Sequence, residues 1–208
     1  MRITVLISGG GTTLRNLLDH QQALPSGSQI IQVISSNSQS PGLALARGAG
    51  IAAISLNPRD YHHSDPTAGL AAFSQEIFKH CRKEQSDLIV CAGFLKKLII
   101  PDDFWLKSIN IHPSLLPAFG GAGMYGLRVH AAALAAGVKL SGCTVHFVDN
   151  QYDQGPIIAQ SAVPVLAGDT PVSLAARVFA AECELYPRVI RWLAEGRVRL
   201  RDNRVEVI

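Results

Sequence analysis

The sequence predicts an α/β fold in which helices cover both faces of an open, mostly parallel, twisted sheet, and three observations lead to it. The 208 residues are 48% hydrophobic and 17% charged, so one such domain can bury a sizeable core. Short β-branched runs alternate with helical patterns along most of the chain. At the start, a strand pattern, a glycine-rich loop and a helix pattern follow one another directly.

Each expected element follows from a local pattern. The β-branched run Arg2–Ile7 predicts a buried parallel strand, because such strands are covered on both faces. Apolar spacing along one face predicts a helix over 68–83. Thr170 and Pro171 are typical of an N-cap and a first helical position, so the last long helix should begin there. Further strands are expected at residues 29–35, 51–56, 87–92, 110–112, 139–148 and 156–164, and shorter helices at 14–18, 43–49, 101–107 and 129–136.

Composition and charge narrow the class of protein. The net charge of +3 is small and scattered, which argues against nucleic-acid binding. The basic cluster from Arg197 to Arg204 alternates like the exposed face of an edge strand, so the fold allows a C-terminal antiparallel edge. The four cysteines form no C-x-x-C pair, and no apolar run is long enough to span a membrane. We therefore expect a cytoplasmic protein with reduced thiols, and a single domain over residues 1–208.

The segment from Ile109 to Pro117 places an amide and an imidazole two residues apart. Side chains at i and i+2 of an extended chain point to the same face, so Asn110 and His112 can aim at one point. Pro113 ends the strand, and ligands of open α/β sheets bind at such strand exits. Asn can donate a hydrogen bond to an oxyanion, and His can also move a proton. On spacing alone, ordinary loop-capping residues remain an equal alternative.

The run Asn-Ile-His-Pro-Ser-Leu-Leu-Pro at 110–117 resembles the signature of the folate-dependent formyltransferases. The stretch 141–156, a strand pattern followed by two aspartates and Gln-Gly-Pro, is similar to the family's second motif. The resemblance extends from Ile3 to about Leu193 and implies the Rossmann-like formyltransferase fold. It assigns formyl transfer to three catalytic residues, Asn110, His112 and Asp153. Spacing alone does not choose between Asp153 and Asp149, but the motif does.

The glycine-rich loop after the first strand is neither G-x-G-x-x-G nor a Walker A sequence, and a tight structural turn would explain it equally well. The resemblance implies that Gly10, Gly11, Thr12 and Thr13 bind the phosphate of glycinamide ribonucleotide. The family usually has Gly-Asn-Gly-Ser-Asn there, and threonine hydroxyls can still bind phosphate oxygens.

A helical glutamate, Glu182, matches the family residue that contacts the ribose or amine of the ribonucleotide. The structural alternative is a solvated helix carboxylate, and the neighbouring Glu184 serves as an internal control. His130 is expected to be structural rather than catalytic, and His146 is expected to be a packed, hydrogen-bonded histidine near the site. Residues 118–127 form a glycine-rich stretch that either covers the substrate or only connects two elements.

The segment after the fourth expected strand resembles the family's pterin-binding stretch. The residues assigned to folate binding are Leu95, Lys96, Lys97, Leu98, Asn110, Asp149 and Asn150. Core packing is the alternative for Leu95 and Leu98, and an arginine that relatives often place against the folate has no match here. The resemblance therefore implies a phosphate-binding half to about residue 100 and a folate-binding, catalytic half from 101 to 208, sharing one sheet.

The implied reaction transfers the formyl group of 10-formyltetrahydrofolate to glycinamide ribonucleotide in de novo purine (IMP) biosynthesis. We expect Asp153 to hold His112 protonated by raising its pKa above about 6.5. No metal, nucleic acid or membrane partner is expected, and the chain should be a monomer or homodimer. Formyltetrahydrofolate hydrolase, or a formyltransferase for another phosphorylated amine, is the alternative. Methionyl-tRNA and nucleotide-sugar formyltransferases usually carry an additional C-terminal domain. A dehydrogenase should show an acidic residue where Ser35-Ser36-Asn37 stands.

Overall fold

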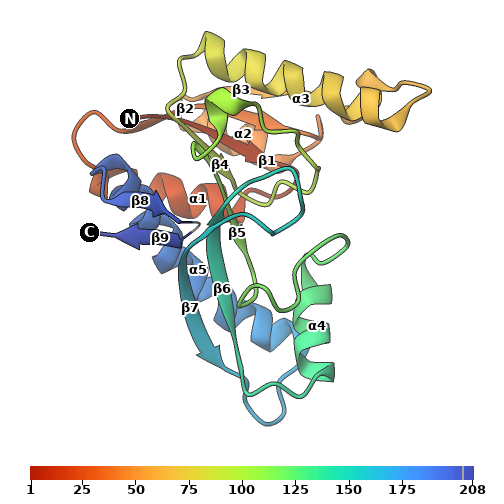
Figure 1. Cartoon of the computed structure of the whole chain (residues 1–208), viewed down its shortest axis with the longest axis vertical. Coiled ribbons are helices and arrows are strands. Elements are labelled where there is room, and N and C mark those ends of the chain that lie inside the picture. The colour runs from red at the N-terminus through yellow and green to blue at the C-terminus, as the bar shows by residue number, and fades with distance from the viewer. Residues whose placement is uncertain (203) are drawn as a thin grey trace. The chain divides into compact units, whose positions relative to one another are not determined.

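The computed structural model describes residues 1–202 and 204–208, which form two compact units, Met1–Ile109 and Asn110–Ile208. Figure 1 shows the order of helices and strands along the chain. Seven strands are hydrogen-bonded in the order β3-β2-β1-β4-β5-β6-β7, and two further strands form a separate sheet. In the described part of the chain, no helix is long and apolar enough to cross a membrane.

The first unit contains four parallel strands. β1 (Arg2–Ile7) pairs with β2 (Gln29–Ser35) on one side and with β4 (Leu88–Cys91) on the other. β3 (Ala52–Ser55) pairs with the outer edge of β2. Nearly every side chain of β1 and β4 is buried, which explains why these strands are almost continuously apolar.

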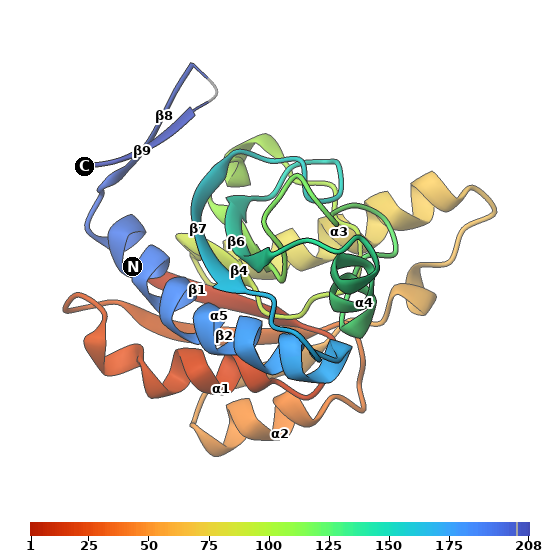
Figure 2. The same cartoon turned by 90° about the horizontal axis from the view of Figure 1, so that it is seen from below.

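Helices cover both faces of these four strands. Figure 2 shows α1 (Thr12–Asp19) and α2 (Pro41–Gly48) on one side of β1 and β2, and α3 (Pro66–Lys83) on the other. Asp65 caps α3 by accepting the Thr67 N–H, so this helix begins two residues before the expected start at 68. Single 3-10 turns complete the unit at Gln21–Ala23, Pro58–Tyr61 and Asp102–Phe104.

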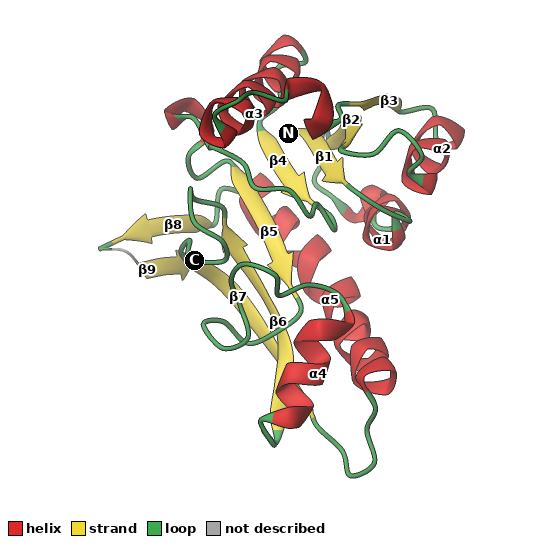
Figure 3. Ribbon diagram, turned by 90° about the vertical axis from the view of Figure 1, so that its right-hand side faces the viewer, coloured by secondary structure: helices red, strands yellow, loops and turns green. Residues whose placement is uncertain are grey.

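The second unit is built on β6 (Leu140–Phe147) and β7 (Ile157–Pro164), which pair antiparallel. In Figure 3 these strands run side by side, and α5 (Pro171–Ala194) packs behind them. β5 (Ser108–His112) leads into the unit, and α4 (Leu127–Ala135) packs on α5. The side chain of Thr170 caps α5 by accepting the Ser173 N–H, as the sequence predicts.

The C-terminal arginines lie on a separate antiparallel hairpin of β8 (Val198–Arg201) and β9 (Arg204–Val207). Arg199 and Arg201 are exposed, whereas Val198 and Leu200 are half-buried, so the expected alternation is present. The predicted fold class is confirmed: a mostly parallel sheet with helices on both faces and a C-terminal antiparallel element. The expected single domain and its boundary near residue 100 stay predictions.

Candidate active site

The end of β5 carries the two residues that the motif singles out. Asn110 is half-buried and His112 is buried, at alternate positions of the strand. The turn that follows is fastened to β6 through Thr144, whose Oγ1 donates to the Ser114 carbonyl at 2.7 Å and accepts the Leu116 N–H at 3.0 Å. This fastening fixes where the strand ends, and with it where the two side chains point.

His112 lies between two hydrogen-bond acceptors. Its Nε2 is 2.9 Å from the Phe119 carbonyl oxygen, and its Nδ1 is 3.5 Å from Asp153 Oδ2. Burial lowers the pKa of His112, while the Asp153 carboxylate and the hydrogen bond to the Phe119 carbonyl raise it, and the net shift is downward. The expectation of a raised pKa is therefore wrong, because loss of solvent outweighs a carboxylate held beyond hydrogen-bond distance.

Asp153 is held by backbone and side chains of its own unit. Its φ of 57° lies in the left-handed region, which an L-residue adopts at a cost. Oδ2 accepts the Gly121 N–H at 2.8 Å, and Oδ1 lies 3.7 Å from His146 Nε2. Burial acts to raise the pKa of Asp153, but His146, His112 and the Gly121 N–H together lower it, so the carboxylate form is favoured.

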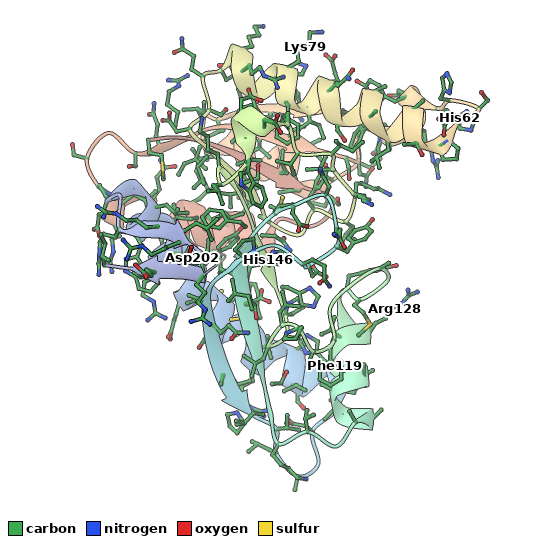
Figure 4. The ribbon with its side chains drawn as sticks, in the orientation of Figure 1. His62, Lys79, Phe119, Arg128, His146 and Asp202 are labelled. Carbon is green, nitrogen blue, oxygen red and sulfur yellow. The ribbon has the colours of Figure 1, made fainter. Side chains whose placement is uncertain are left out.

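His146 on β6 joins this group, and Figure 4 marks it together with Phe119. Its Nδ1 lies 2.8 Å from the Phe147 carbonyl oxygen, and its Nε2 lies 3.3 Å from Asn110 Nδ2. Its 2% exposure and its Nδ1 contact confirm the prediction of a packed, hydrogen-bonded histidine near the site, although that prediction did not name Asn110 as its neighbour. The available signal was its position on the strand that leads directly to Asp153.

The other two residues expected in this loop lie before Asp153. Asp149 is half-buried, and its Oδ1 accepts the Gln151 N–H at 2.8 Å, closing a local turn. Asn150 is exposed. The carboxylate that lies against His112 is that of Asp153, which favours it over Asp149 as the partner.

In the first unit, the glycine-rich loop lies against the start of α2. Gly11, with φ 78°, precedes α1, and a Cβ there would lie 2.9 Å from the Gly42 Cα. At Gly9 and Gly10, by contrast, no described atom lies within 4 Å of an added Cβ. No described side chain caps α1, and Thr12 and Thr13 form its first turn, so backbone N–H groups are left at the helix start.

The stretch after β4 is attached to this loop through Ser8. The Ser8 N–H donates to the Gly93 carbonyl at 3.2 Å, and Ser8 Oγ accepts the Leu95 N–H at 2.9 Å. Leu95 is 52% exposed, so its side chain is not part of the core, and Lys96 and Lys97 are also exposed. Leu98 is buried, which fits the core-packing alternative for its side chain.

The two glutamates of α5 differ in their surroundings. Glu182 is half-buried, and burial raises its pKa to about 8. It faces β6, where burial and, to a smaller extent, Glu182 raise the pKa of Cys143 to about 12. Glu184 is exposed. Within one helix, the carboxyl group expected to bind substrate is therefore the one that is partly removed from water.

Comparison with known proteins identifies the family. The Formyl transferase profile matches residues 1–190. The chain is 39% identical to "Phosphoribosylglycinamide formyltransferase, chloroplastic" of Vigna unguiculata, over 100% of this chain and 65% of that protein. It is 35% identical to "Phosphoribosylglycinamide formyltransferase" of Escherichia coli (strain K12), over 98% of this chain and 92% of that protein.

A solved structure agrees with these relatives. Glycinamide ribonucleotide transformylase 1 from Symbiobacterium toebii matches with a TM-score of 0.86 and 39% identity, over 100% of this chain and 94% of that chain. The resemblance read from the two motifs is thereby confirmed. The chain belongs to the formyl transferase family, as one of its phosphoribosylglycinamide formyltransferases.

Proposed function

We propose that this chain transfers the formyl group of 10-formyltetrahydrofolate to the amine of glycinamide ribonucleotide, giving formylglycinamide ribonucleotide and tetrahydrofolate in de novo purine (IMP) biosynthesis. Family membership supplies the formyl transfer. The observation that carries the proposal is the group in the second unit, where Asp153 lies against His112 and His146, and His146 lies against Asn110. The formyl donor, 10-formyltetrahydrofolate, and the amine acceptor, glycinamide ribonucleotide, are both part of this proposal.

Asn110 is the oxyanion donor in this account. Attack of the amine on the formyl carbon turns the carbonyl oxygen into an oxyanion and the amine into an ammonium group. An amide N–H of Asn110 would donate to that oxygen, because an amide nitrogen is a donor at any ordinary pH. Removing one such donor typically lowers kcat about 100- to 1,000-fold.

His112 moves the proton. Its Nε2–H donates to the Phe119 carbonyl, and its lowered pKa leaves Nδ1 free to accept the proton of the ammonium group. Asp153, 3.5 Å from Nδ1, then stabilises the imidazolium. As the bond from carbon to N10 breaks, the imidazolium returns the proton to N10, so the proton lost by the amine is gained by tetrahydrofolate.

The remaining assigned residues bind the two substrates. Open space at Gly10 and the uncapped start of α1 support phosphate binding by residues 10–13. The half-buried Glu182 is assigned to the ribose or amine of the ribonucleotide. For the folate, the exposed residues 95–97 and the loop at Asp149 and Asn150 are the stronger candidates, because the Leu98 side chain is in the core. Holding both substrates lowers the entropic cost of bringing amine and formyl group together.

The location and the oligomeric state of the protein are further parts of the proposal. We propose a cytoplasmic location, although the named relatives include a chloroplastic enzyme. A monomer or homodimer, without metal, nucleic acid or membrane partner, stays a prediction. Cell fractionation and size-exclusion chromatography with light scattering would test location and oligomeric state.

The test of the function is an assay of the purified chain with 10-formyltetrahydrofolate and a panel of phosphorylated amines. Mass spectrometry should find a formylated product with glycinamide ribonucleotide, and tetrahydrofolate should appear in equal amount. Equal release of tetrahydrofolate without any amine would instead identify a hydrolase. Faster formylation of another phosphorylated amine would change the assigned acceptor.

A further inference from the structure

His146 makes two polar contacts that require opposite properties of its ring. Nδ1 lies 2.8 Å from the Phe147 carbonyl oxygen, and a carbonyl oxygen can only accept a hydrogen bond. Nε2 lies 3.3 Å from Asn110 Nδ2, and an amide nitrogen can only donate one. Both contacts are satisfied when Nδ1 carries the proton and Nε2 carries a lone pair.

The surroundings of the His146 side chain leave its ring little freedom to turn. His146 is 2% exposed, in a strand whose neighbours on both sides along the chain are also buried. The register between β6 and β7 shifts between Val145 and His146, so that His146 pairs with Ile157. The extra residue at this shift is Ile158, so the bulge lies on β7 and not on the strand that carries His146.

A competing arrangement would place the proton on Nε2 and direct it to Asp153. That arrangement would account for the way His146 lowers the pKa of Asp153. Against it, the distance from Nε2 to Asp153 Oδ1 is 3.7 Å, which is longer than a hydrogen bond, whereas Asn110 Nδ2 is 0.4 Å closer at 3.3 Å. The Phe147 carbonyl would still need a donor at Nδ1. The distances therefore favour Asn110 as the partner of Nε2.

We propose that His146 is a positioning residue, which accepts one N–H of Asn110 at Nε2 and so leaves the second N–H of the same amide for the oxyanion. This inference rests on the role of Asn110 given under the proposed function. The oxygen and nitrogen of an Asn side chain have nearly the same shape, so packing alone does not choose between its two orientations. A half-turn of the amide would present its oxygen, an acceptor, where the reaction needs a donor.

The first test needs no variant. Long-range ¹H–¹⁵N NMR of the unmodified, ligand-free protein reports which ring nitrogen of each histidine carries the proton. We expect a protonated, pyrrole-like Nδ1 and an unprotonated, pyridine-like Nε2 for His146 at neutral pH. A proton on Nε2, alone or together with one on Nδ1, would overturn the proposal, because Nε2 could then not accept from Asn110.

The second test compares two amide replacements of the same ring. In His146→Gln, the side-chain oxygen can reach the place of Nε2 and accept from Asn110, whereas the shorter His146→Asn side chain reaches only the place of Nδ1. We expect His146→Asn to lower kcat about 10- to 100-fold with little change in KM for either substrate, and His146→Gln to keep most of the activity. Equal loss in both variants, or a change in KM alone, would contradict a positioning role.

The closing experiment separates this inference from the proposed function. We expect His146→Asn to cost nothing further in a chain that already carries Asn110→Ala, because His146 acts through Asn110. A full multiplicative loss in the double variant would overturn the inference and leave the role of Asn110 intact. Full activity of Asn110→Ala alone would instead remove the oxyanion donor from the proposed function, and this inference with it. If His146→Asn fails to fold, the NMR result on the unmodified protein still decides.

Discussion

The group around Asp153 and the glycine-rich loop differ in whether their polar groups have partners within the protein. Around Asp153, side chains are held by partners within the protein: the Gly121 N–H and two histidines for Asp153, and the Phe119 carbonyl for His112. In the glycine-rich loop, no described atom occupies the space beside Gly10, and no described side chain caps α1. The helix α5, by comparison, carries a complete capping box. The difference indicates that the proposed catalytic groups are preorganised by the fold, whereas the loop has backbone donors available for the proposed phosphate.

The largest effect is expected at Asp153. Asp153→Asn removes the charge but nearly keeps the shape, so kcat at neutral pH should fall by about 1,000-fold or more, comparable to His112→Asn. The two changes combined should cost little more than either alone, since the residues act as a unit. Asp149→Asn is the matched control and should keep most of the activity. Steady-state kinetics of the four variants would check this, and a large loss in Asp149→Asn would reopen the choice of aspartate.

The next effect is expected at the glycine-rich loop, where two adjacent glycines differ. Gly10→Val has room within the protein, so it should fold normally and raise KM for the ribonucleotide about 10-fold or more by blocking phosphate approach. Gly11→Val should instead lower the free energy of unfolding by about 1–3 kcal/mol, because its φ is 78° and Gly42 is in contact. Kinetics and thermal denaturation distinguish the two. Unchanged ribonucleotide affinity in folded Gly10→Val would remove the loop from the site.

A smaller effect is expected on α5. Glu182→Ala should raise KM for the ribonucleotide more than KM for the folate, whereas the exposed Glu184→Ala should change neither substantially. Initial rates with each substrate varied in turn give both constants. Equal increases in the two KM values would point to a structural helix residue.

The smallest effect concerns stability rather than catalysis. Burial raises the pKa of Glu182 from its usual 4.5 to about 8, so the folded state holds a proton that the unfolded chain has released across this window. The contribution of Glu182 to stability must therefore fall as pH rises from 4.5 to about 8. Glu182→Gln removes this dependence and should be more stable than the parent by about 1–3 kcal/mol at pH 9. Urea denaturation at pH 5 and pH 9 measures it, and the same difference at both pH values would contradict the burial argument.

Local patterns were sufficient for most of the fold. Arg2–Ile7 and Gln29–Ser35 are strands with the expected ends, and Thr170 caps α5, because strand propensity and helix capping depend on neighbours in sequence. His112 and Asp153 are 41 positions apart in the chain, so no local pattern could pair them. Their pairing was predicted from the order of the two motifs.

Properties that depend on tertiary packing could not be predicted from local sequence patterns. The pKa of His112 was expected to rise, but it depends on how much water the fold removes. The need for glycine at position 11 arises from Gly42, far along the chain, and not from the loop's own sequence. The contact between His146 and Asn110 joins side chains of two strands that are 36 positions apart, and no local sequence pattern predicts it.

The most direct measurement of the central claim is an NMR pH titration of His112 in the parent protein and in Asp153→Asn. We expect a His112 pKa below about 6.5 in the parent and a still lower pKa in the variant, because the Asp153 carboxylate opposes the effect of burial. The same variant should have lost its activity at neutral pH. An unchanged His112 pKa together with retained activity would contradict the role of Asp153.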